Sequence, residues 1–478
     1  MVGGCSGDDG GATTATTDAA TAGSTATTPG STSDGGSSTS TSGAGSESES
    51  GATTAATVTS AASSSTSDAT TDSTTDSTTG GVDPADPCPP LGIDDGPTIP
   101  VGPAEAGQLP GIVLDAAAGT TILLADGTYD LTTPLHFTRP GVSLRSASGD
   151  RAAVILDGGY NTGEIALVQA DGVTIADLTL RRATWHPIHV TGGSDHTIEG
   201  TLIYNVAVID PGQQGIKVNP SAELFYADKG TIACSWIELT DAGRGHVDGC
   251  YTGGIDAHSA LGWVVRDNHI EGFWCEQGLS EHAVHFWVTG RDTLVERNAI
   301  VDCARGVGFG LGATGNGKTR DYGDDPCPGA DYLGHIDGVI RNNMIFAGRP
   351  ELFASQSGFD SGVALEQACG AVVRHNTVVS LEQPFVSMEY RWPNTQVTIE
   401  NNLVTHAIVE RDGGKASLAG NLEGAGLDHF VDAAGGDCHL APGSAAIDAG
   451  GDVGVVDDFD GDLRDASPDI GADERGGG

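Results

Sequence analysis

The chain has 478 residues, and its 22 Lys and Arg against 65 Asp and Glu give a formal net charge of −43 at pH 7. Eleven of the acidic residues precede Cys88, so the rest of the chain still carries a charge of about −32. This excludes nucleic acid as a partner, because phosphate backbones are bound by clustered Lys and Arg. An anionic glycan would need local basic residues or bound Ca²⁺ to overcome the repulsion.

Residues 1–90 are predicted to form a disordered tether. They consist mainly of Ser, Thr, Gly and Ala with scattered acids, and they contain no Lys or Arg; such a segment cannot bury a core. Near its start, Val2, Gly3 and Gly4 precede Cys5, which resembles the lipobox of bacterial lipoproteins. A lipid on Cys5 would be the only membrane contact of a surface-held domain. No basic and apolar segment precedes this motif, so a chance match is the alternative.

Eight cysteines remain besides Cys5, an even number that is compatible with four disulfides in an exported protein. Pairing of Cys327 with Cys369 is plausible, and two of Cys250, Cys275 and Cys303 could form another bond. We therefore expect an extracytoplasmic protein, either secreted or held at the cell surface or outer membrane as a lipoprotein, and we expect a monomer.

Residues 91–410 are predicted to form a solenoid of parallel strands. Residues 117–131, AAGTTILLADGTYDL, give a strand, an Asp-Gly turn and a second strand. Further along the chain, a five-residue frame that alternates apolar and polar residues recurs seven times, which indicates stacked coils. The seven frames are residues 187–191, 215–219, 254–258, 283–287, 306–310, 362–366 and 385–389.

The phrase in residues 117–131 resembles the opening of right-handed parallel β-helix proteins of the pectate lyase and polysaccharide lyase type. The resemblance implies an all-β, right-handed parallel β-helix and a carbohydrate substrate. It covers residues 114–474, because the C-terminal sequence also resembles a motif that closes secreted bacterial β-helices.

A second repeat predicts a column of asparagines at one bend of successive coils, since Asn tolerates left-handed backbone and its amide can bond to the Asn above and below. The expected members are Asn268, Asn298, Asn343, Asn376 and Asn401. Residues 411–478 are predicted to be a C-terminal cap. Its Asp458, Asp460 and Asp462 have a spacing that could hold Ca²⁺, although no complete EF-hand loop is present.

Stacking the seven frames predicts two inward files of apolar residues and two outward files. Because adjacent strands lie about 4.8 Å apart, one outward file brings ionisable side chains together in a column. The predicted catalytic residues are Lys217, Asp256, His258 and His285. The predicted substrate-binding residues are His189, Asn219, His282, Trp287, Arg305, Arg320, Glu366 and Tyr390. Gly308 and Gly310 are expected to leave a hollow for a sugar ring. A solvated sheet face with an ordinary Lys217–Asp256 salt bridge is the alternative.

The resemblance implies a polysaccharide lyase that cleaves a uronate-containing glycan by β-elimination. The residues of the column permit this reaction, with Lys217 or His285 as the base and His258 sharing proton transfer, but they do not select each role. Ca²⁺ on Asp256 could replace a basic residue opposite the substrate carboxylate. A glycoside hydrolase that uses Asp256, Glu366 and Glu389 is the second possibility. Asp256 and Glu366 are expected to lie too far apart for this reaction, so a loop acid, Asp248, Glu276 or Glu281, would have to take part. A tethered adhesin that binds glycans without turnover is the third.

Overall fold

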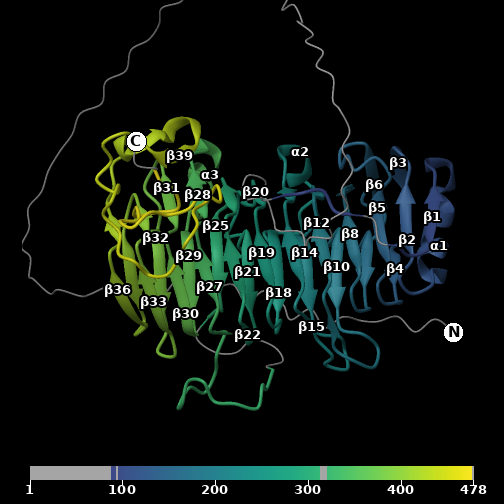
Figure 1. The fold of residues 1–478 in the computed structure, drawn as a ribbon, viewed down its shortest axis with the longest axis horizontal. Coiled ribbons are helices and arrows are strands. Elements are labelled where there is room, and N and C mark those ends of the chain that lie inside the picture. Colours follow the sequence, from purple (N-terminus) through teal and green to yellow (C-terminus); the bar gives the residue numbers. More distant parts are fainter. Residues whose placement is uncertain (1–87, 93–94, 313–319, 476–478) are drawn as a thin grey trace, which may run out of the picture. The chain divides into compact units, whose positions relative to one another are not determined.

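The computed structural model describes residues 88–92, 95–312 and 320–475. The lipobox cysteine and the predicted tether, apart from its last three residues 88–90, lie outside the described residues. From Thr98 to Glu423 the regular elements are almost all short strands, which pair in parallel with the strand one coil earlier and one coil later. Figure 1 shows these strands stacked side by side along the coil. The fold is the predicted right-handed parallel β-helix.

The coil has three long sheets. The ten-stranded sheet comprises β4 (Leu135–Phe137), β7 (Ala166–Val168), β10 (Ile188–Thr191), β14 (Gln214–Asn219), β18 (Gly253–His258), β21 (Val284–Trp287), β25 (Arg305–Phe309), β29 (Ser361–Glu366), β32 (Val386–Arg391) and β35 (Ile408–Arg411). All seven recurring frames lie on this sheet, which therefore carries the predicted site.

The other two sheets complete each coil. The fourteen-stranded sheet comprises β1 (Thr98–Val101), β2 (Thr121–Leu124), β5 (Ser143–Ser146), β8 (Thr174–Ala176), β12 (Leu202–Tyr204), β16 (Thr231–Ala233), β19 (Val264–Arg266), β22 (Gly290–Arg291), β23 (Leu294–Glu296), β26 (His335–Ile336), β27 (Val339–Arg341), β30 (Ala368–Arg374), β33 (Gln396–Glu400) and β36 (Lys415–Ala419). The eleven-stranded sheet comprises β3 (Gly127–Asp130), β6 (Val154–Asp157), β9 (Thr179–Arg181), β13 (Ala207–Ile209), β17 (Trp236–Glu238), β20 (His269–Glu271), β24 (Ala299–Val301), β28 (Met344–Ala347), β31 (Thr377–Ser380), β34 (Leu403–Val404) and β37 (Leu422–Glu423).

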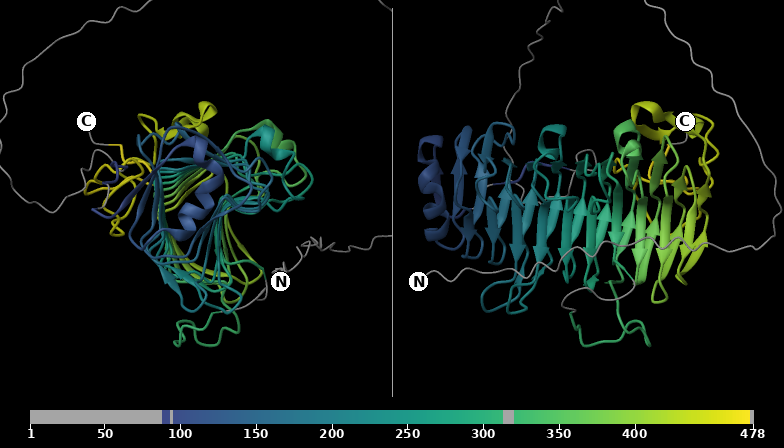
Figure 2. Two further views of the ribbon diagram at one scale, coloured as in Figure 1. Left: turned by 90° about the vertical axis from the view of Figure 1, so that its right-hand side faces the viewer. Right: turned by 180° about the vertical axis from the view of Figure 1, so that it is seen from behind.

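The remaining elements are short. They are the strand pairs β11 (Ile198–Glu199) with β15 (Ala227–Asp228) and β38 (Phe430–Asp432) with β39 (Asp437–Leu440), the helices α1 (Leu109–Asp115), α2 (Asp241–Arg244) and α3 (Pro350–Ala354), and three 3₁₀ turns at Pro103–Gln108, Leu427–His429 and Ala433–Gly435. Helix α1 lies across the open end of the first coil (Figure 2) and buries Leu109 and Val113 in the core. No helix of the described residues is long and apolar enough to span a membrane.

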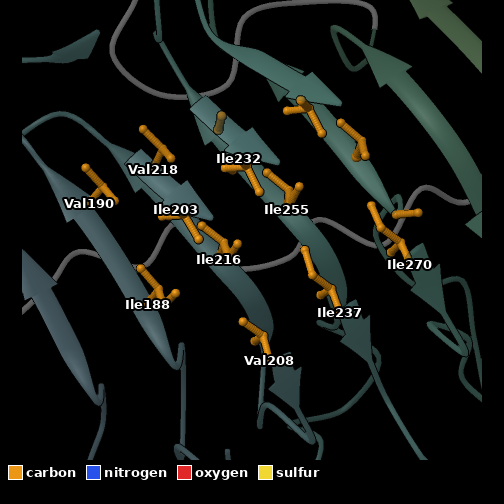
Figure 3. Packing of buried hydrophobic residues seen from close by; sticks show 14 of the residues in the cluster. Ile188, Val190, Ile203, Val208, Ile216, Val218, Ile232, Ile237, Ile255 and Ile270 are labelled. Carbon is orange, nitrogen blue, oxygen red and sulfur yellow. The ribbon is translucent and has the colours of Figure 1, made fainter. Parts of the chain in front are cut away.

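Inward side chains of all three sheets fill the interior in files. Ile188, Ile216 and Ile255 stack on the ten-stranded sheet and face residues such as Ile203 and Val208 from the other sheets (Figure 3). Each of these side chains is fully buried, and full burial of an aliphatic side chain contributes about 1.5–3 kcal/mol. The repetition of such contacts fixes the register of each coil on the next.

The predicted register between the last two frames, on β29 and β32, is wrong. Ala364 pairs with Glu389, not with Ser387, and Val363 pairs with Met388, not with Val386. The error is two residues, so every side chain keeps its face. Because Val386 and Met388 are both apolar, the alternation alone does not distinguish the two registers.

The asparagine column contains Asn402 instead of Asn401. Each side-chain amide donates to the side-chain oxygen of the next Asn at 2.9–3.0 Å, through Asn268, Asn298, Asn343, Asn376, Asn402 and Asn421. The left-handed residue is the one that precedes each ladder Asn, and Asn401 itself has φ 55°. The column was predicted, but its last member was misplaced by one residue.

Three disulfides form among the described residues. Cys327–Cys369 confirms the predicted pair, and Cys250–Cys275 resolves the choice among three cysteines. Cys88–Cys234 ties the start of the described chain to the coil across 146 residues. Cys303 and Cys438 are buried free thiols, so a fourth bond does not form. Disulfides of this kind are typical of proteins that fold outside a reducing cytoplasm.

Candidate active site

The predicted column of ionisable residues exists. His189 pairs with Lys217, Lys217 with Asp256, and Asp256 with His285, on the adjacent strands β10, β14, β18 and β21. His258 pairs with Trp287 two residues further along the same strands. The alternation of each frame puts these side chains on the outer face, because the opposite register would bury them in the aliphatic core.

A buried ion pair forms the centre of the site. The Lys217 ammonium bonds to Asp256 Oδ2, and the side chains are 7% and 2% exposed. Burial alone would lower the pKa of Lys217, but the Asp256 carboxylate outweighs burial and raises that pKa above its usual range. Burial likewise opposes ionisation of Asp256, yet Lys217 holds the pKa of this carboxyl well below its usual range. Lys217 is therefore a fixed cation and not a base.

Three groups surround the ammonium. Besides Asp256, Lys217 Nζ lies 3.2 Å from the Tyr251 hydroxyl and 3.1 Å from His258 Nε2. Burial, and then the charge of Lys217, lowers the pKa of His258, so the imidazole is neutral at pH 7. Burial raises the pKa of Tyr251, so the phenol keeps its proton. The site thus places a neutral base, His258, and a protonated acid, Tyr251, next to one cation, Lys217.

The His258 side chain is 23% exposed, and Tyr251 and Trp287 are also half-buried. These three partly exposed side chains therefore lie between the buried Lys217–Asp256 pair and solvent. Trp287 Nε1 donates to Asp256 Oδ1 at 2.7 Å, and the His258 ring contacts the Trp287 ring edge-on with centroids 4.6 Å apart. These contacts fix the orientation of both rings at the surface.

His285 lies on the opposite side of Asp256 and is fully buried. Its Nε2 lies 3.1 Å from the carbonyl of Gly310, and its ring is stacked on Trp287. Its Nδ1 lies 3.3 Å from Glu281 Oε2 and 3.7 Å from Asp256 Oδ1. With no solvent access, His285 is not placed to abstract a proton from a bound glycan.

The expected hollow at Gly308 and Gly310 is wrong. The ring of His282 occupies the space beside Gly308, where an added Cβ would lie 2.6 Å from His282 Nε2. Gly310 has φ 79°, and a Cβ there would meet the carbonyl of Glu366. Both glycines allow close packing, so they leave no room for a sugar ring.

Two predicted binding residues lie at the two ends of this group of strands. His189 is the first member of the column; its Nε2 lies 2.6 Å from the side-chain oxygen of Asn219, and its Nδ1 lies 3.4 Å from Glu164. Arg305 begins β25, where Gly308 holds the column position; it donates to Asp360 at 2.9 Å and is largely buried. Each of the two already has a protein partner.

Arg320, Glu366 and Tyr390 are held away from the central group. Arg320 makes two bonds to Asp228, and Glu366 accepts hydrogen bonds from the Gly312 backbone and the Trp392 indole. Tyr390 pairs in register with the inward residue Leu365 and packs against the core. The structure gives none of these three a contact with Lys217, Asp256, His258 or His285.

Calcium ligation would require displacement of existing bonds. The two oxygens of Asp256 already accept from Lys217 and Trp287. In the cap, Asp458 accepts from the backbone N–H groups of Asp460, Asp462 and Glu474. Asp460 instead groups with His439 and Asp473, and the potential ligand atoms of these three side chains lie within 4.8 Å of one another. Asp462 does not join that group, and calcium at the three predicted aspartates stays a prediction.

Tyr251 was missed by sequence reasoning, and Glu281 was considered only as one of several loop acids. Both lie just outside the strands, on the loops that precede β18 and β21. Loop residues carry no periodic signal, so nothing in the sequence marks Tyr251. The only available hint is its place next to Cys250, whose disulfide to Cys275 joins the two loops.

The stacked coils define a parallel β-helix, and the outer face of its ten-stranded sheet carries the buried network around Lys217 and Asp256. Neither a family model nor a curated protein sequence matches the chain. A pectate lyase structure matches with 15% identity and a TM-score of 0.49, over 80% of this chain and 98% of that one. An alginate lyase from Paenibacillus sp. matches with 16% identity and a TM-score of 0.45, over 68% and 99%. A surface adhesin of Streptococcus pneumoniae matches with 14% identity and a TM-score of 0.42, over 67% and 87%.

Proposed function

We propose that this protein is a polysaccharide lyase that cleaves a uronate-containing glycan by β-elimination at the Lys217–Asp256 pair. One observation carries the proposal. A single ammonium lies within 3.2 Å of both a neutral imidazole and a protonated phenol at the half-exposed edge of a buried network. β-Elimination needs a base, an acid and a positive charge near the substrate carboxylate, and this group supplies all three.

In the proposed reaction, the uronate carboxylate binds beside Lys217 and draws the ammonium away from His258. His258 Nε2 then removes the proton α to the carboxylate. The β carbon–oxygen bond breaks as the carbon–carbon double bond forms, and the Tyr251 hydroxyl gives its proton to the departing oxygen. Water at the half-exposed side chains of His258 and Tyr251 then returns the proton from His258 to Tyr251, while Lys217 stays an ammonium.

Hydrolysis fits the site less well. A glycosidase needs two carboxyl groups that face the substrate about 5–9.5 Å apart. The oxygens of Asp256 are bonded to Lys217 and Trp287, and Glu389 is bonded to Arg411. Glu366 is bonded to a backbone amide and an indole. Among these carboxylates and Glu281, only Glu281 has a buried oxygen without a hydrogen-bond partner. One free carboxylate cannot serve both roles.

The test is a panel of uronate-containing and neutral polysaccharides, with product detected by the absorbance of the unsaturated uronate. We expect product from at least one uronate glycan, and a decrease of about 10²- to 10⁴-fold in rate for His258→Gln and Tyr251→Phe. The matched control is His269→Gln on the eleven-stranded sheet, where the imidazole stacks on Trp236. Release of reducing ends without unsaturated product would indicate a hydrolase, and binding without any product would indicate an adhesin.

A further inference from the structure

We propose that Glu281, His282 and His285 form a binding site for a divalent transition-metal ion of the Zn²⁺ type. The proposal does not depend on the reaction proposed above. One ligand atom from each of the three side chains lies within 4.8 Å of those of the other two. Two imidazoles and a carboxylate are ligands that bind Zn²⁺ and its first-row neighbours, whereas Ca²⁺ takes oxygen ligands.

The surroundings of His285 favour a cation at its Nδ1. Since a carbonyl only accepts, the bond to Gly310 requires a hydrogen on Nε2. Nδ1 then presents a lone pair toward Glu281 Oε2 at 3.3 Å and Asp256 Oδ1 at 3.7 Å. Neither Nδ1 nor Glu281 Oε2 has a hydrogen-bond partner. Metal-bound histidines typically donate the other ring N–H to a backbone carbonyl, as His285 does here.

His282 is a second, independent observation. Its side chain is 1% exposed, and neither ring nitrogen has a hydrogen-bond partner. Burying a polar group without a partner is unfavourable, because the group loses its hydrogen bonds to water. The ring lies 4.3 Å from that of His285 by centroids, in space that only a glycine at position 308 leaves open. Ligation would satisfy this imidazole, for which the described part of the chain supplies no hydrogen-bond partner.

The ion would fasten the loop before β21 to the sheet. Glu281 and His282 end that loop, whose other fixed point is the Cys250–Cys275 disulfide. His285 lies on β21 itself. The expected consequence is stability that depends on metal, because an ion that binds only the folded state shifts the unfolding equilibrium by mass action.

The test uses the full chain, stripped with a chelator and then titrated with Zn²⁺, Co²⁺ and Ca²⁺ separately. We expect one equivalent of Zn²⁺ per chain by elemental analysis, a Co²⁺ visible spectrum typical of mixed nitrogen and oxygen ligands, and a Zn²⁺-dependent rise in melting temperature. His282→Ala and Glu281→Gln should weaken binding by more than about 10-fold, the smallest effect known for changes outside the ligand shell. The control variant His439→Ala removes one residue of a second group in the cap, His439, Asp460 and Asp473, whose ligand atoms also lie close together. This variant should bind Zn²⁺ as the wild type does.

Glu281→Gln keeps the size of the side chain and provides a readout if His282→Ala does not fold. The chelator-dependent melting shift of the wild type needs no variant at all. Absence of stoichiometric Zn²⁺ binding would overturn the proposal. Unchanged binding in His282→Ala and Glu281→Gln, or preference for Ca²⁺ over Zn²⁺, would also overturn it.

Discussion

Replacement of Asp256 by Asn tests the central ion pair. The side chain is 2% exposed and is bonded to Lys217 and Trp287. Asparagine keeps the shape but removes the countercharge, leaving an ammonium that is 7% exposed with no carboxylate beside it. Breaking a buried pair in this way costs about 3–5 kcal/mol. We expect the free energy of unfolding of Asp256→Asn to fall by that amount at pH 7.

The measurement is a double-mutant cycle in urea, followed by circular dichroism, with Asp256→Asn, Lys217→Met and the double variant. The double variant should be more stable than the sum of the single effects by about 1–3 kcal/mol, because it leaves no unpaired buried charge. The exposed Lys229–Glu199 pair supplies the control, and Glu199→Gln should leave stability unchanged. Strict additivity at Lys217 and Asp256, or wild-type stability of Asp256→Asn, would refute the reasoning.

The Lys217–Asp256 pair also makes the stability of the fold depend on pH. The pKa of Asp256 is lower in the folded than in the unfolded chain, so its contribution is complete above the ordinary value of 3.8 and is lost as pH falls. The pKa of Lys217 is raised, so its contribution is complete below 10.5 and is lost as pH rises. The destabilisation by Asp256→Asn should therefore be constant between pH 3.8 and pH 10.5, and it should shrink as pH falls below the lower value or rises above the upper one.

Three further predictions concern stability. Asn343→Ala should lower the free energy of unfolding by about 3 kcal/mol in urea titrations. The buried Asn343 amide donates to one carbonyl of its own coil and one of the preceding coil, and it is bonded to its two neighbours in the asparagine column. A loss below 1 kcal/mol would contradict this. Gly308→Ala should destabilise the chain by about 1–3 kcal/mol, since the Cβ would overlap the His282 ring, whereas Gly111→Ala, with open space in α1, should stabilise it slightly. Replacement of Cys88 and Cys234 by Ala should cost about 2–4 kcal/mol by the same assay, and an unchanged midpoint would count against a structural role.

The fold and the central column could be predicted because they depend on a repeated local rule. Each frame alternates apolar and polar residues, and only one parity keeps Lys217, Asp256 and His285 out of the aliphatic core. The same rule fails where two registers satisfy it equally, as at Val386 and Met388. Exact neighbours then depend on loop lengths, which the alternation does not encode.

The rest of the site depends on groups that carry no periodic signal. Tyr251 and Glu281 reach the column from loops, and their positions follow from packing of the loops on the sheet. The meaning of Gly308 was misjudged for the same reason, because sequence does not show that the ring of His282 occupies the adjacent space. Likewise, the sequence gives no sign that Asp228 engages Arg320.

The most direct test of the proposed reaction is the fate of solvent oxygen. A uronate glycan is digested by the wild-type chain in water labelled with heavy oxygen, and the products are analysed by mass spectrometry. Elimination at Lys217, Tyr251 and His258 predicts unsaturated products that contain no solvent oxygen, and none of this product with the Tyr251→Phe, His258→Gln double variant. Products that carry one labelled oxygen per cleavage, or full elimination by the double variant, would contradict the account.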